Sequence, residues 1–135
     1  MSKPSHEDVK KLIRELIVPF YLIERDMRLP VEKERSENDA EHSWSLALLA
    51  CSLAPHIDKT LDIGLVCQFA IVHDLVEVEA GDISVWDKNY SKKTKQEAEK
   101  RALKSMSKKF SHFPWLVKMI NRYEDQNSNE ARYVK

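Results

Sequence analysis

The sequence of 135 residues predicts a single domain of the all-α class. Apolar residues recur at steps of three and four positions along most of the chain, which is the spacing of amphipathic helices. The alternation of β-branched residues that indicates a half-buried strand is absent, and only 2 glycines occur. These observations predict a bundle of about five to six helices.

The first helix is predicted over residues 9–20. Its apolar residues lie three or four positions apart: Val9, Leu12, Ile13, Leu16, Ile17 and Phe20. Pro19 is expected to kink or end this helix, because proline has no N–H to donate to the preceding turn. Residues 26–38 are polar and contain a proline, so we expect a loop there. Asn38 or Asp39 is expected to cap the next helix.

Two central helices are predicted next, over residues 39–54 and 60–79. The first carries apolar residues on two faces, and Pro55 is expected to end it. The second is apolar nearly all round, which predicts burial on most sides. Steps of 100° per residue place four of its residues on one stripe with Asp74 beside it: Val66, Ala70, His73 and Glu77. Gly81 is expected to stop this helix.

The last third of the chain predicts further helices. Residues 91–110 form a charged pattern with a narrow apolar face, and Pro114 is suited to the first position of a fifth helix. Ser128 or Asn129 is able to cap a sixth, but the sequence stops at Lys135, barely one turn later. We therefore expect a single domain over residues 1–135 whose C-terminal part is truncated.

Composition limits the classes of partner. Lysine and arginine (22) balance aspartate and glutamate (22), so no overall field attracts nucleic acid or an acidic membrane. No apolar run reaches the roughly 18 residues of a membrane span. Cys51 and Cys67 lie in apolar stretches without a metal-type spacing, as expected for reduced thiols in a cytoplasmic protein. We expect a small-molecule partner, no nucleic acid polymer and no membrane.

The pair His73–Asp74 interrupts an otherwise apolar segment, and this is the strongest indication of chemistry. A charge in apolar surroundings costs several kcal/mol or more unless it is compensated. The simplest compensation is a bound cation, and His42 on the other central helix offers a further ligand. Imidazole nitrogen and carboxylate oxygen suit one divalent ion such as Mn, Co, Ni, Fe or Zn, with Mg also acceptable. Glu77 is placed to orient a water molecule or to act as general base.

A metal-free interpretation stays open at this point. His73, Asp74 and Glu77 are also able to form a buried network of hydrogen bonds. His42 alone is more typical of a core histidine that is satisfied by hydrogen bonds. The metal hypothesis therefore depends on the whole set, and it predicts metal-assisted hydrolysis.

Three segments together resemble a known family. Residues 35–44 (RSENDAEHSW), 71–77 (IVHDLVE) and 80–82 (AGD) resemble the HD-domain metal-dependent phosphohydrolases, and among them the branch of the 5′-deoxynucleotidases. The resemblance implies an HD-domain helical bundle and a role for each matching residue. The implied metal ligands are His42, His73 and Asp74, the catalytic residues Glu77 and Asp82, and the phosphate-binding residue Arg35. Arg25 is a further basic candidate near the substrate.

This resemblance implies hydrolysis of (deoxy)nucleoside 5′-monophosphates to nucleoside and phosphate. Family members also carry a final aspartate ligand on the last core helix, and this sequence ends at Lys135 before the corresponding position. Two alternatives follow: a catalytically silent, truncated helical module, or a hydrolase of cyclic or polyphosphorylated nucleotides. The apolar fifth helix and Tyr90 also suggest a face for a homodimer.

Overall fold

The computed structural model describes residues 2–29, 34–81 and 88–135, and it confirms the predicted all-α class apart from one small hairpin. In chain order the elements are α1 (His6–Leu12), the π-helix η1 (Ile13–Ile17), α2 (Val18–Tyr21), β1 (Glu24–Arg28), β2 (Ser36–Asn38), α3 (Asp39–Ile57), α4 (Ile63–Val72), α5 (Glu77–Ala80), α6 (Lys92–Lys109), α7 (Pro114–Glu124) and α8 (Asn129–Val134).

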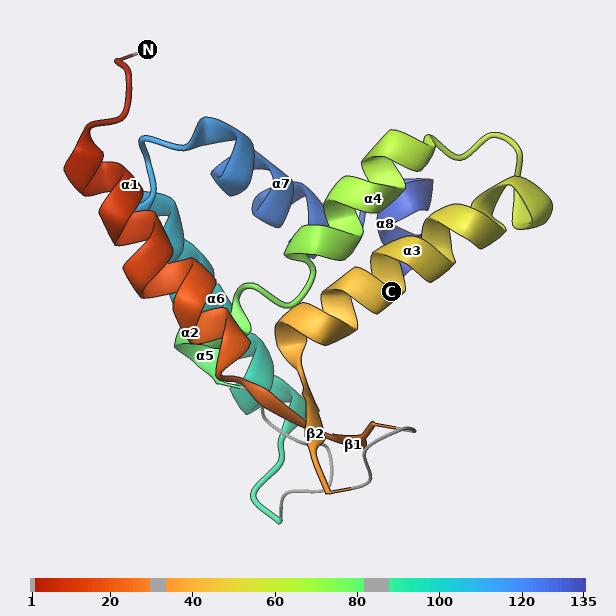
Figure 1. The fold of residues 1–135 in the computed structure, drawn as a ribbon, viewed down its shortest axis with the longest axis horizontal. Helices are drawn as coiled ribbons and strands as arrows, with labels where there is room; N and C mark the ends of the chain where they lie inside the picture. The colour runs from red at the N-terminus through yellow and green to blue at the C-terminus, as the bar shows by residue number, and fades with distance from the viewer. Residues whose placement is uncertain (1, 30–33, 82–87) are drawn as a thin grey trace.

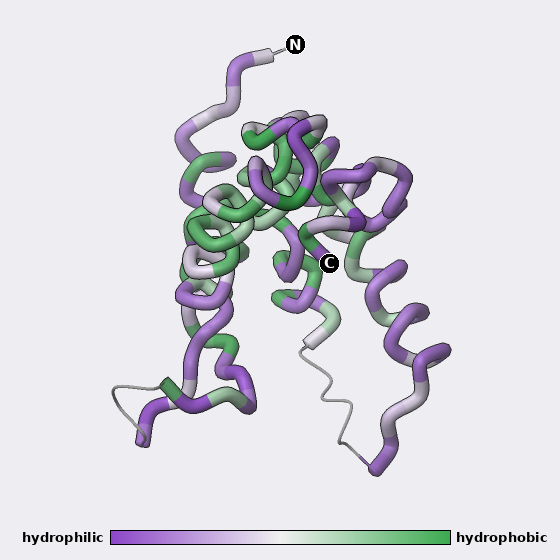
Figure 2. Tube along the Cα trace, turned by 90° about the vertical axis from the view of Figure 1, so that its right-hand side faces the viewer, coloured by the Kyte–Doolittle hydropathy of each residue, from purple (hydrophilic) through white to green (hydrophobic). Residues whose placement is uncertain are grey.

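Helix α4 is the centre of the fold, as the sequence predicts. It packs against α3, α7 and α8, and Figure 1 shows it between these helices. Val66, Phe69 and Ala70 on α4 are fully buried. In Figure 2 the hydrophobic stretches gather around this region, whereas α6 and the hairpin are mostly hydrophilic. Burial of this apolar helix therefore organises the core.

The N-terminal helix continues through Pro19, so the expected end at that residue is wrong. The Val18 N–H donates to the carbonyl of Ile13, five residues back, in the wider π-helical register. Proline cannot donate to the residue four positions back, and its ring crowds that carbonyl. The π-helical turn widens the helix just before Pro19, and the chain stays helical to Tyr21.

The loop expected over residues 26–38 is wrong for most of its described part. β1 and β2 form an antiparallel pair, and the Leu29 N–H donates to the carbonyl of Arg35 beyond it. The residues joining these strands, 30–33, lie outside the described part of the chain. The side chains of β1 are mostly exposed, so the polar sequence carries no alternation that predicts a strand. Backbone hydrogen bonds hold the hairpin.

Helix α3 begins as predicted but differs in its end and its packing. Asn38 caps it, and Glu41 completes a capping box. The helix passes Pro55 and ends at Ile57, so the predicted end is about one turn early. Trp44 is 69% exposed and Leu49 is 59% exposed, which contradicts the expectation that this helix is packed on most sides.

The helix predicted over residues 60–79 is in fact broken. α4 stops at Val72, residues 73–76 form turns, and α5 resumes at Glu77. Gly81 follows α5 with a positive φ of 81°, in agreement with the predicted stop. The break falls on the His73–Asp74 pair.

The C-terminal helices follow the sequence prediction. Ser91 caps α6, Pro114 opens α7 and Ser128 caps α8. The apolar face of α7 is turned inward and is formed by Leu116, Met119, Ile120 and Tyr123. That face is therefore part of the core, contrary to its suggested use in a homodimer. Among the described residues, no helix is both long and apolar enough to cross a membrane.

Substitution of Met106 on α6 tests whether this side chain is packed in the core. It is 1% exposed, so we expect Met106→Ala to lower the free energy of unfolding by about 2–5 kcal/mol through lost contacts and a cavity. The control Met27→Ala removes the same side chain at a position that is 63% exposed, and we expect a change of about 0.5 kcal/mol or less. Urea unfolding measures both, and equal effects would contradict this packing.

Candidate metal centre

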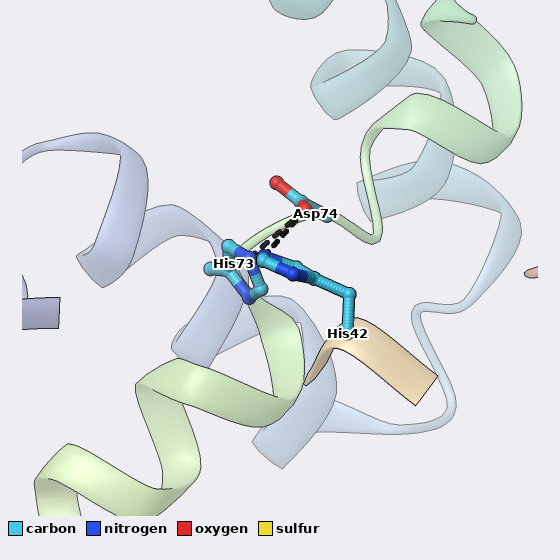
Figure 3. Close-up of side chains that lie close together, drawn as sticks. All are labelled: His42, His73 and Asp74. Carbon is cyan, nitrogen blue, oxygen red and sulfur yellow. Dashed lines mark ion pairs between the residues drawn. The ribbon is translucent and has the colours of Figure 1, made fainter. Parts of the chain in front are cut away.

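Two imidazoles and a carboxylate converge at the N-terminal end of α3. His42 lies in the first turn of α3, and His73 and Asp74 lie in the turn that follows α4. Nε2 of His73 is 2.9 Å and Nε2 of His42 is 4.0 Å from Oδ2 of Asp74, and Figure 3 shows the three side chains together. The two rings are 5.3 Å apart between centroids. The predicted ligands His42, His73 and Asp74 thus meet in one place.

The orientation of His73 indicates a need for a cation. Its Nδ1 lies 2.8 Å from the carbonyl oxygen of Ala70, which only accepts hydrogen bonds, so Nδ1 carries a proton. In the neutral ring the Nε2 lone pair then faces Oδ2 of Asp74. Two acceptors at this distance repel unless a proton or a metal ion lies between them. Nε2 is therefore presented as metal ligands usually are, with the other nitrogen anchored to the protein.

His42 is arranged in a similar way. Its Nδ1 lies 3.3 Å from Oε2 of Glu37, the residue before the cap of α3. Burial lowers the pKa of His42, and the positive charge of Arg25 acts in the same direction. A neutral imidazole is the form that binds a metal ion, so the surroundings of His42 favour the ligand state near neutral pH.

Arg25 of β1 inserts positive charge among the carboxylates. Its Nη1 lies 2.8 Å from Oδ2 of Asp74 and 3.0 Å from Oδ1 of Asp39. Burial alone would raise the pKa of Asp74, but the contact with His73 and the positive charge of Arg25 outweigh it and lower that pKa. Asp74 is therefore held in the ionised form, which is the form that binds metal.

Asp39 is a member of the centre that the sequence interpretation missed. It was considered only as a helix cap, yet it is fully buried and groups with Asp74 and Glu77 in a second cluster of carboxylates. Burial raises the pKa of Asp39, and the nearby charge of Asp74 adds to this. The available signal was its position three residues before His42, on the same side of the helix.

The remaining predicted residues occupy different positions. Glu77 is 7% exposed and belongs to the carboxylate cluster with Asp39 and Asp74. Arg35 is near the surface, with its Nη1 2.8 Å from Oε1 of Glu41. Asp82 lies outside the described residues.

Tyr123 of α7 covers one side of the centre. Its ring meets that of His73 edge to face, with centroids 6.1 Å apart. Burial raises the pKa of Tyr123 to about 12, with the charge of Asp74 as a smaller contribution. Tyr123 therefore packs against His73, although the sequence interpretation did not assign it to the site. The donor set, its anchoring and its shared carboxylate together match the requirements of a divalent ion.

Comparison with known proteins gives a family and a related structure. The sequence model of a family described as HD domain matches residues 23–135. A solved structure from Magnetospirillum magnetotacticum MS-1, described as a predicted metal-dependent phosphohydrolase, is 29% identical with a TM-score of 0.76. The match covers 95% of this chain and 63% of that chain, so this chain spans less than two thirds of that protein. Both findings support the predicted helical bundle. No curated protein matches the chain.

Removal of His73 tests the ligand set. We expect His73→Ala to abolish the visible absorption of bound Co²⁺, because one of the two imidazole ligands is lost. The control His56→Ala changes an exposed histidine at the far end of α3 and should leave the absorption unchanged. Unchanged Co²⁺ absorption in His73→Ala would remove the assignment.

Glu124 of α7 provides a test of the charge around the centre. Burial raises its pKa from 4.5 to about 7, and the charges of Glu99 and Asp74 contribute. Between these pH values the folded state holds a proton that the unfolded state has released, so the free energy of unfolding falls as pH rises. We expect Glu124→Gln to stabilise the protein at pH 8 by an amount on the order of 1 kcal/mol, after allowance for solvent screening, and to have no such effect at pH 4.

Thermal or urea unfolding across this pH range measures the effect. Asp125→Asn is the control, since Asp125 is an exposed acidic neighbour. A stability difference between wild type and Glu124→Gln that does not change with pH would contradict the burial of this carboxyl group.

Proposed function

The chain belongs to the HD-domain family, and from this membership we propose that it acts as a metal-dependent phosphohydrolase. One observation carries the proposal: the Nε2 atoms of His42 and His73 both face Oδ2 of Asp74, and Nδ1 of His73 is anchored on a backbone carbonyl. Stability alone gives no reason to collect these groups, because buried polar clusters without partners are costly.

The ligands His42, His73 and Asp74 would hold one divalent ion. When bound, such an ion supplies Lewis acidity toward a phosphoryl oxygen and makes an attacking water molecule more acidic. Asp74 contributes negative charge that increases affinity for the ion, and the neutral imidazole of His42 binds without first losing a proton.

Glu77 and Arg25 supply the groups that the reaction needs beside the ion. Glu77 is a buried carboxylate close to Asp74, and it is suited to orient the attacking water and accept its proton. The guanidinium of Arg25 is partly exposed beside Asp74, and a guanidinium suits contact with phosphate oxygens. Arg35 is the second candidate for this contact, and its use requires exchange of its ion pair with Glu41.

We propose (deoxy)nucleoside 5′-monophosphates as the substrate class. The motif residues 35–44 and 71–77 support this through their resemblance to the 5′-deoxynucleotidase branch. A dianionic monoester also matches a site that offers one ion and arginine side chains. The experiment is a phosphate-release assay with Mn²⁺ or Co²⁺ on nucleoside monophosphates, cyclic nucleotides and nucleoside triphosphates. Release from the monophosphates alone supports the proposal, and release from none of these substrates overturns it.

Glu77→Gln separates catalysis from metal binding. We expect it to lower kcat by about 10²–10⁴-fold, because the amide cannot accept the proton of the attacking water. Co²⁺ absorption should persist, since His42, His73 and Asp74 remain. Glu24→Gln on the exposed side of β1 is the matched control and should retain full activity. An unchanged kcat in Glu77→Gln would assign the base to another residue.

A further inference from the structure

The two cysteines of the chain lie on neighbouring helices. Cys51 is on α3 and Cys67 is on α4, and these helices pack against each other (Figure 1). Sγ of Cys51 lies 3.8 Å from the carbonyl oxygen of Ile63, one helical turn before Cys67. Because a carbonyl in an α-helix points toward the residue four positions later, the Cys51 thiol reaches the turn of α4 that carries Cys67.

Short side chains around Cys51 allow α3 to approach its neighbours closely. A disulfide bond requires two Cα atoms that are less than about 7 Å apart. The residues of α3 that pack toward the core beside Cys51 are alanines, at positions 47, 50 and 54. Since alanine adds only a methyl group, no long side chain at these positions keeps α3 away from α4. The packing is therefore suited to a covalent link between the two helices.

Both thiols are also accessible from one cavity. Cys51 and Cys67 line an apolar cavity of about 1090 Å³ between η1, α3 and α4, and neither residue is fully buried. Cysteines that are enclosed in a core are inert because reagents do not reach them. A molecule as small as hydrogen peroxide reaches these two sulfur atoms through the cavity.

We propose that Cys51 and Cys67 form an oxidation site, at which hydrogen peroxide joins α3 to α4 through a disulfide bond. One thiolate attacks an oxygen of the peroxide, the O–O bond breaks, and hydroxide leaves and takes up a proton to become water. The product is a sulfenic acid. The other thiol attacks its sulfur, the S–O bond breaks as the S–S bond forms, and a second water leaves. The two thiols lose two electrons, which the peroxide takes up.

The surroundings of Cys51 suit it to the second of these steps. Burial raises the pKa of its thiol, and the neighbouring thiol of Cys67 adds to this increase. Cys51 therefore stays protonated near neutral pH, and Cys67 makes the first attack, since the thiolate is the nucleophile. The site needs no metal ion, so this inference is independent of the proposed function.

Thiol titration and mass spectrometry test this site without ambiguity, because the chain contains 2 cysteines. Peroxide should remove both free thiols of the native wild type and lower the intact mass of the single chain by two hydrogen atoms. Dithiothreitol should restore both thiols. The same treatment in urea should pair the thiols more slowly, because unfolding separates α3 from α4. In Cys51→Ser, peroxide should give a sulfenic acid on Cys67 that dimedone traps.

The matched control moves one thiol along α3. The double variant Cys51→Ser with Ser52→Cys turns the thiol by about 100° around the helix, and it should not pair with Cys67 within one chain. Free thiols that survive peroxide in the native wild type, or that pair only between chains, overturn the proposal. Equal rates of pairing within the chain in native and unfolded protein, or in the wild type and a folded control variant, overturn the part played by the fold. Circular dichroism checks folding of the variants.

Discussion

The centre depends on positive charge among buried carboxylates. Asp39 is fully buried and Asp74 is mostly so, and the guanidinium of Arg25 lies against both. Removing one partner from such a cluster is strongly destabilising, whereas replacing the whole cluster by apolar residues is often neutral or stabilising. The cluster is therefore a poor source of stability. Its presence in the interior is better explained by the proposed binding of a metal ion.

This requirement gives the small hairpin a role beyond its size. β1 carries Arg25, and β2 leads directly into the cap of α3 through Glu37 and Asn38. The hairpin thereby positions the guanidinium of Arg25 against Asp74 and the carboxylate of Glu37 against His42. Its strands expose polar side chains and contribute little apolar burial. The hairpin thus serves the centre more than the core.

Much of the helical fold follows from the sequence because its signals are local. Ser91, Pro114 and Ser128 begin helices for reasons that the neighbouring residues supply. The hairpin and the break after Val72 were not predicted, since β1 carries no apolar alternation and residues 60–79 are apolar nearly all round. Of the candidate site, His73 and Asp74 were found through their apolar setting, and His42 through the set that it forms with them. Asp39 was not, because an aspartate beside a cap is ordinary until its burial is known.

The break in the predicted helix separates His73 and Asp74, which lie in a turn, from Glu77, which begins α5. On a continuous helix, the Cα–Cβ bonds of His73 and Asp74 would diverge by about 100°. The turn over residues 73–76 instead lets His73 anchor Nδ1 on Ala70 while its Nε2 faces Asp74. The helix then resumes at Glu77, whose carboxylate lies close to those of Asp39 and Asp74. Asp74 therefore belongs both to the group with the two imidazoles and to the group of carboxylates.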